Sequence, residues 1–152
     1  MKALTLTQPW ATLVALGAKK IETRSWSTSY RGWLAIHAAK NCPKRDMDFW
    51  REEPFKAALY PGGIYTYPEL ECGMVLAKAL LIGCKLIVEN GSCIGHGEIH
   101  KMIPPEDPER SFGDYYAGRY GWILSNVRKF PTPIPAKGAL GLWEWEPLEL
   151  KG

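Results

Sequence analysis

The chain has 152 residues, of which 46% are hydrophobic and 23% charged, and its formal net charge at pH 7 is +3. A chain of this length forms one domain with a sizeable core, here over residues 1–152, and no apolar run reaches the roughly 20 residues that span a membrane. The small positive charge permits nucleic acid as a partner without requiring it.

The cysteines and the start of the chain bear on its compartment. The four cysteines lie far apart, with no Cys-x-x-Cys pair: Cys42, Cys72, Cys84 and Cys93. The first residues show no long apolar core followed by a small-residue cleavage site, so no signal peptide is visible. We therefore expect free thiols, a reducing cytoplasmic location, a monomer, and no contact with a membrane.

A strand and a short helix are the first predicted elements. Residues 2–6 alternate as a strand, and residues 9–16 carry an apolar stripe at helical spacing, formed by Trp10, Leu13 and Leu16. Pro9 suits the first helical position, where a missing N–H has no intrahelical role. Gly17 suits the left-handed residue that ends a helix.

The next segment predicts a strand over residues 20–26. In an extended conformation, Glu22, Arg24 and Trp26 share one face, and Thr23 lies on the other. A carboxylate, a guanidinium and an indole side by side form a polar surface of the size of a small ligand. The alternative is a solvated hairpin strand that carries a surface ion pair.

The remaining elements follow from alternation and from the placing of glycine and proline. In chain order the sequence predicts a polar turn at 27–32, a second hairpin strand at 33–39, a helix at 44–59 broken at Pro54, a loop at 60–72, a strand at 74–88 bent at Gly83, irregular loops at 89–119, a strand at 120–126, an extended segment at 132–135, and a closing strand at 139–145.

Several of these segments together resemble a known family. The patterns are Gln8-Pro9-Trp10-Ala11, Gly17-x-Lys19, Glu22-x-Arg24-x-Trp26, Tyr30-Arg31-Gly32 and Gly138-x-x-Gly141-Leu142-Trp143. They resemble the ASCH domain (activating signal cointegrator homology), a branch of the PUA-like β-barrels, and run from residue 4 to about 146. The resemblance implies an α+β fold, a partly open β-barrel of about six strands with peripheral helices.

Binding of RNA or of a modified nucleoside is the function that we expect from these residues. Arg24 would recognise a phosphate or a base edge, and Glu22 would accept a hydrogen bond from an amine or a ribose hydroxyl. Trp10 or Trp26 would supply a stacking face. The expected site is a basic, aromatic cleft between the helix and the strand; the alternative is a structural ion pair that braces the barrel.

Four further residues are candidates for the same ligand site. Tyr30, His37 and Lys40 lie on the second hairpin strand and its turn, and Ser125 follows an apolar run at the end of a predicted strand. His37 has a suitable pKa for acid–base chemistry near neutral pH. The alternatives are a hydrogen-bonded core histidine and an ordinary surface lysine.

A second hypothesis is an enzyme, either an amidohydrolase acting on N4-acylated cytidine or a ribonuclease. One branch of the family that this chain resembles hydrolyses N4-acetylcytidine with the lysine and threonine of a G-x-K-x-x-T-x-R motif and a distal glutamate. Here Lys19 matches the lysine, but Glu22 occupies the threonine position. The resemblance thus points to Lys19 and Glu22 as the catalytic pair, with the distal glutamate open among Glu69, Glu71 and Glu98.

One cluster has residue types that suit zinc, namely Cys93, His96, Glu98 and His100. His96, Glu98 and His100 would share one face of a strand only if Gly95 and Gly97 formed no turn between them, and the sequence has no cysteine pair to complete a zinc site. We therefore expect no metal and no cofactor.

Overall fold

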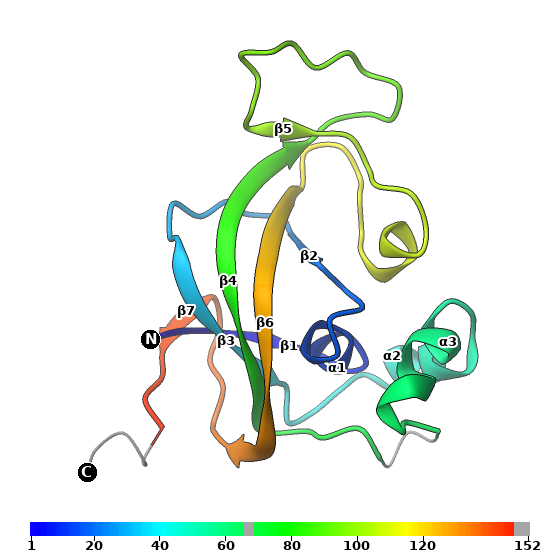
Figure 1. Ribbon diagram of the computed structural model, residues 1–152, viewed down its shortest axis with the longest axis vertical. Coiled ribbons are helices and arrows are strands. Elements are labelled where there is room, and N and C mark those ends of the chain that lie inside the picture. Colours follow the sequence, from blue (N-terminus) through cyan, green and yellow to red (C-terminus); the bar gives the residue numbers. More distant parts are fainter. Residues whose placement is uncertain (66–68, 148–152) are drawn as a thin grey trace.

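One open mixed sheet organises the computed structural model, which describes residues 1–65 and 69–147 (Figure 1). Over these residues it has seven strands in the order β2-β6-β4-β3-β1-β7, with β5 paired to β4. The strands are β1 Lys2–Leu6, β2 Ile21–Arg24, β3 Gly32–Ala38, β4 Met74–Ile87, β5 Lys101–Met102, β6 Tyr120–Pro135 and β7 Leu142–Glu144. The predicted α+β, PUA-like fold is confirmed; the short β5 was not predicted.

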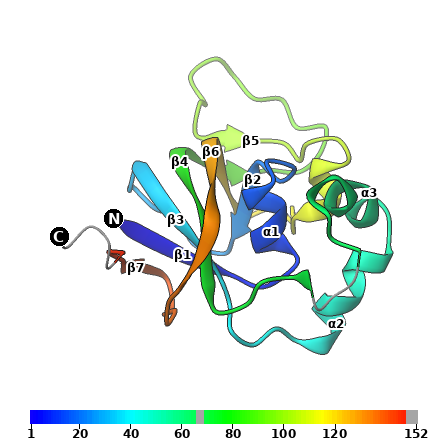
Figure 2. The ribbon, with the colours of Figure 1, turned by 60° about the horizontal axis from the view of Figure 1, so that its bottom comes forward.

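The helices are short and gather beside one end of the sheet, away from β7 and the chain termini (Figure 2). They are α1 Trp10–Ala15, α2 Lys44–Met47, η1 Asp48–Arg51, α3 Phe55–Leu59, η2 Tyr60–Gly62 and η4 Glu109–Phe112. The predicted break at Pro54 is confirmed, since α3 begins directly after it. Residues 66–68, which belong to the predicted loop at 60–72, lie outside the described residues.

The helix α1 is bounded by Gln8 and Gly17. Pro9 stands at the N-cap and not at the first helical position, so the prediction was one residue off. Pro9 has no side chain that can cap the helix. The Gln8 side chain takes this role, because its Oε1 accepts a hydrogen bond from the backbone N–H of Thr12 at 3.0 Å. At the other end Gly17 has φ +78°, and Ala18 N–H donates to Leu13 O at 3.0 Å, as in a Schellman motif.

The predicted hairpin of residues 20–26 with 33–39 is wrong. The strand β2 pairs with β6, with Glu22 opposite Trp122, and lies at one edge of the sheet. The strand β3 lies between β1 and β4, and its pairing with β1 is parallel. A parallel pair needs a crossover, which the segment with α1 supplies, so α1 packs on the sheet between the two strands.

The longest pair, β4 with β6, curves the sheet. The register shifts between Leu81 and Gly83, so the predicted bend at Gly83 is confirmed. Residues 120–126 and 132–135 form one strand, not two, because a second shift opposite Val75 and Ala77 accommodates the proline-containing part of β6.

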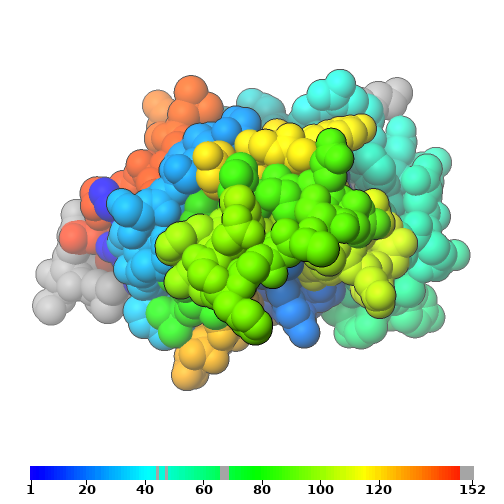
Figure 3. All heavy atoms as spheres, turned by 90° about the horizontal axis from the view of Figure 1, so that it is seen from above, coloured from blue at the N-terminus to red at the C-terminus, as the bar shows by residue number. Residues whose placement is uncertain are grey.

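The main cluster of buried apolar side chains packs α1 on the sheet, and its largest fully buried residue is Trp122. A second cluster joins α1 to α3 and η4 through Leu13, Phe55, Leu59 and Phe112. The residues that follow β4 spread over one end of the sheet, as the view from above shows (Figure 3). The four cysteines are free, and no helix among the described residues is both long and apolar enough to cross a membrane.

Candidate functional site

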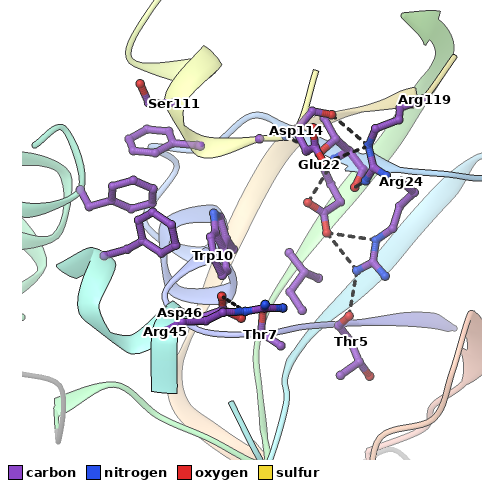
Figure 4. Close-up of a pocket in the computed structure, with 16 residues that line it drawn as sticks. Thr5, Thr7, Trp10, Glu22, Arg24, Arg45, Asp46, Ser111, Asp114 and Arg119 are labelled. Atoms are coloured by element: carbon purple, nitrogen blue, oxygen red, sulfur yellow. Dashed lines mark hydrogen bonds and ion pairs between the residues drawn. The ribbon is translucent and has the colours of Figure 1, made fainter. Parts of the chain in front are cut away.

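A cavity of about 660 Å³ opens where α1, β2, the helices after residue 44 and the segment around η4 meet (Figure 4). Trp10 projects from α1 into it, beside the pair formed by Glu22 and Arg24 of β2. The cavity therefore lies between the helix and the strand to which the sequence assigned the binding residues.

One wall of the cavity is aromatic. The Trp10 ring meets Phe49 edge-on at 5.4 Å between centroids and Phe55 at 6.3 Å, and Phe55 in turn meets Phe112 at 5.2 Å. Phe55 and Phe112 are buried, whereas Trp10 is half-buried. Edge-to-face contacts of this kind fix the rings relative to one another, so the indole stands on a rigid support.

The polar wall is built by Glu22 and Arg24. Glu22 Oε2 accepts from Arg24 Nε at 3.1 Å and from Nη2 at 2.9 Å, and Nη2 also donates to the Thr5 carbonyl at 2.8 Å. Glu22 Oε1 accepts from the Thr23 amide at 3.1 Å. The carboxylate is thus occupied by protein donors and positions Arg24, whose Nη1 has no partner among the described residues.

Lys19 lies beneath this wall and not in it. Its side chain is fully buried, with Nζ 2.6 Å from the Phe112 carbonyl and 3.5 Å from Glu22 Oε1. Burial lowers the pKa of Lys19, and the nearby carboxylates of Glu22 and Glu109 oppose that shift. Lys19 does not line the cavity, so its amine has no direct access to a ligand there.

The cavity is balanced in charge, which corrects the expectation of a basic cleft. Three arginines and three carboxylates line it: Arg24, Arg45, Arg119, Glu22, Asp46 and Asp114. The Arg119 guanidinium is 3.7 Å from Asp114, and Arg45 is 3.8 Å from Asp46. Each arginine has a carboxylate close by, so the cavity carries no net charge from its lining side chains.

Two other aromatic candidates lie outside this cavity. Trp26 is half-buried and packs edge-on against Trp122 of the main core at 4.7 Å between ring centroids. The Tyr30 hydroxyl donates to the Trp33 carbonyl at 2.5 Å and also packs on that core. Trp26 is not beside Glu22 and Arg24 because β2 ends at Arg24, two residues before the end of the predicted strand. Tyr30 precedes β3, which is not the neighbour of β2.

The remaining candidates are also elsewhere. His37 and Lys40 line a second cavity, described below. Ser125 lies inside β6, opposite Leu80, and not at a strand end, because β6 is longer than predicted.

Sequence reasoning missed most of the cavity wall. Phe49 and Asp46 come from the helices after residue 44, and Phe112, Asp114 and Arg119 come from a segment predicted only as irregular loop. Residues brought in by loops from distant parts of the chain leave no periodic signal. Two local signals were usable: the helical spacing that found Trp10 and the alternation in β2 that found Glu22 and Arg24.

The hypotheses of a distal glutamate and of zinc gain no support. None of Glu69, Glu71 and Glu98 lines the cavity. Within the described ranges, no three His, Cys, Asp or Glu residues are placed to hold a metal ion, the cluster from Cys93 to His100 included.

A family model described as the ASCH domain matches residues 4–134 of this chain. The chain is similar to activating signal cointegrator 1 of Homo sapiens, with 25% identity over 146 residues, and of Mus musculus, with 24% identity over 146 residues. Each comparison covers 93% of this chain and 22% of the relative. The chain therefore spans about a fifth of the length of the curated relatives it matches.

Proposed function

This chain belongs to the ASCH domain family, and we propose that its cavity binds a nucleobase of single-stranded RNA. The observation that carries the proposal is the pairing of one partly exposed indole, Trp10, with a fixed Glu22–Arg24 pair across a cavity of about 660 Å³. Ligand cavities of this size commonly combine apolar walls with a few placed polar groups.

The charge balance of the cavity favours the base over the phosphate as its occupant. A nucleobase is planar and neutral, so it gains from stacking on Trp10 and needs no counter-charge. Arg24 keeps Nη1 available to donate to a carbonyl or ring nitrogen on the edge of the base, while Glu22 holds the guanidinium in place.

Catalysis is not part of the proposal. An amidohydrolase that used Lys19 and Glu22 would need both groups at the substrate, but Nζ is enclosed and the Glu22 oxygens accept from Thr23 and Arg24. In this arrangement Lys19 and Glu22 support the binding wall.

The proposal is tested by affinity for a labelled single-stranded RNA, measured by fluorescence anisotropy. Trp10→Leu keeps apolar volume but removes the π-face, so it should weaken binding by about 1–3 kcal/mol, roughly 5- to 150-fold, whereas Trp10→Phe should keep most of the affinity. Trp33→Ala is the matched control, because Trp33 is also half-buried but lies outside the cavity, against Lys78.

Thermal unfolding of each variant separates a binding defect from a folding defect. A folded Trp10→Leu protein that binds RNA as the unchanged protein does would refute the proposal. Equal losses in Trp10→Leu and Trp33→Ala would refute it as well, since the effect would then not belong to the cavity.

A further inference from the structure

A second cavity, of about 1040 Å³, lies beside the first. It is lined by the end of β1, by β3 and the residues that follow it, and by the segment between β6 and β7. Thr5 lines both cavities. The two cavities are therefore adjacent at Thr5, whose carbonyl accepts from Arg24 on the side of the first cavity and whose hydroxyl meets His37 on the side of the second.

The two cavities differ in charge. Lys40 and Lys137, both exposed, line the second cavity, and no carboxylate is among its lining residues. The first cavity has as many carboxylates as arginines. An anionic group is thus attracted to the second cavity and a neutral group is accepted in the first.

The floor of the second cavity is a buried and fully paired network. His37 Nε2 donates to the Ala136 carbonyl at 2.8 Å, so Nδ1 accepts from the Thr5 hydroxyl at 3.1 Å. Trp143 Nε1 donates to the same hydroxyl at 3.1 Å. His37 therefore has no free atom for a ligand, and its part is to hold Thr5 and the segment after β6 in place.

The segment after β6 is held close to this floor and offers donors. A Cβ on Gly138 would lie 2.6 Å from His37 Cε1, so the backbone there approaches the imidazole more closely than a side chain would allow. Within the described part of the chain, the amides of Lys137, Gly138 and Ala139 donate no hydrogen bond. Backbone amides without an acceptor in the protein, next to two exposed lysines, are suited to phosphate oxygens.

We propose that the second cavity binds the phosphate of a neighbouring nucleotide in the same RNA strand whose base occupies the first cavity. This inference rests on the proposed function and adds a direction to it: the strand runs past Thr5, with its base on the Trp10 side and its phosphate on the Lys40 side. The site recognises the anionic backbone and is independent of sequence.

The test compares a nucleoside with a trinucleotide, each titrated by calorimetry at several salt concentrations. The Lys40→Gln/Lys137→Gln variant should bind the nucleoside as the unchanged protein does. Its affinity for the trinucleotide should be lower, and the slope of log affinity against log salt should be shallower by about 0.7 for each phosphate that the variant no longer neutralises. Lys20→Gln/Lys56→Gln is the matched control, because both lysines are exposed and line neither cavity.

The outcomes separate the two proposals. If the nucleoside binds in a Trp10-dependent manner but the Lys40/Lys137 variant keeps the trinucleotide affinity and slope, the second-cavity inference is overturned and the proposed function stands. If both double variants lose the same affinity, binding follows general surface charge and the inference is again overturned. If no nucleoside or trinucleotide binding depends on Trp10, the proposed function fails and this inference fails with it.

Discussion

The buried pair of Lys19 and Glu22 gives the sharpest test of the structure. In Glu22→Gln the Lys19 ammonium keeps the Phe112 carbonyl at 2.6 Å but loses the carboxylate at 3.5 Å, and it stays fully buried. Loss of one partner of a buried pair costs about 3–5 kcal/mol, because the remaining buried charge loses its nearest counter-charge. We expect the free energy of unfolding to fall by that amount.

The partner variant should cost less. Lys19→Met removes the charge and leaves the Phe112 carbonyl without its donor, which costs about 1–3 kcal/mol. Glu22 then still has Arg24 at 2.9 Å and the Thr23 amide at 3.1 Å. With Met at position 19, the further change Glu22→Gln breaks only the partly exposed contact to Arg24, so it should cost about 1 kcal/mol.

A double-mutant cycle by urea unfolding measures the coupling between the two residues, which we expect to be about 2 kcal/mol or more. The pair Glu98–Lys101 is the control: its atoms are closer, at 2.6 Å, but both side chains are 41% exposed, so its coupling should be much weaker than that of Lys19 with Glu22. Additive effects for Lys19 and Glu22, within about 0.5 kcal/mol, would show that the two charges do not interact as the structure has them.

Three further predictions concern pH, backbone strain and catalysis. Burial lowers the pKa of His37, so between this lowered pKa and about 6.5 the unfolded chain binds more protons than the folded protein does. The stability of the protein relative to His37→Gln should therefore fall as the pH falls through this window, and parallel Tm curves of the two proteins between about pH 8 and pH 5 would contradict the prediction. Gly17→Ala should lower stability by about 1–2 kcal/mol, because φ is +78° while a Cβ there meets no atom within 4 Å; an unchanged urea midpoint would contradict the left-handed helix end. Incubation with N4-acetylcytidine should leave the acetamide intact, since Lys19 is enclosed; release of acetate that is lost in Lys19→Met would contradict that.

Local patterns in the sequence were sufficient for the elements that carry the site. Gly17 ends α1 because only a residue without Cβ adopts that φ at low cost, and Pro54 separates η1 from α3 because it lacks an amide hydrogen. Alternation along β2 placed Glu22 and Arg24 on one face, where they now form a pair. Each of these inferences depends on residues within a few positions of one another, so the chain itself carries the information.

Only the tertiary structure decided which of these residues meet. The alternation of side chains along β3 is the same whether β3 pairs with β2 or with β1, so the sequence does not show which pairing occurs. Because β3 pairs with β1 and not with β2, His37 and Lys40 lie outside the first cavity. The burial of Lys19 depends on the Phe112 carbonyl, 93 residues away along the chain. Strand order and loop placement result from the packing of distant apolar surfaces, and no window of neighbouring residues records that packing. The sequence therefore determined the polar pair, and the tertiary structure determined its aromatic wall and its buried support.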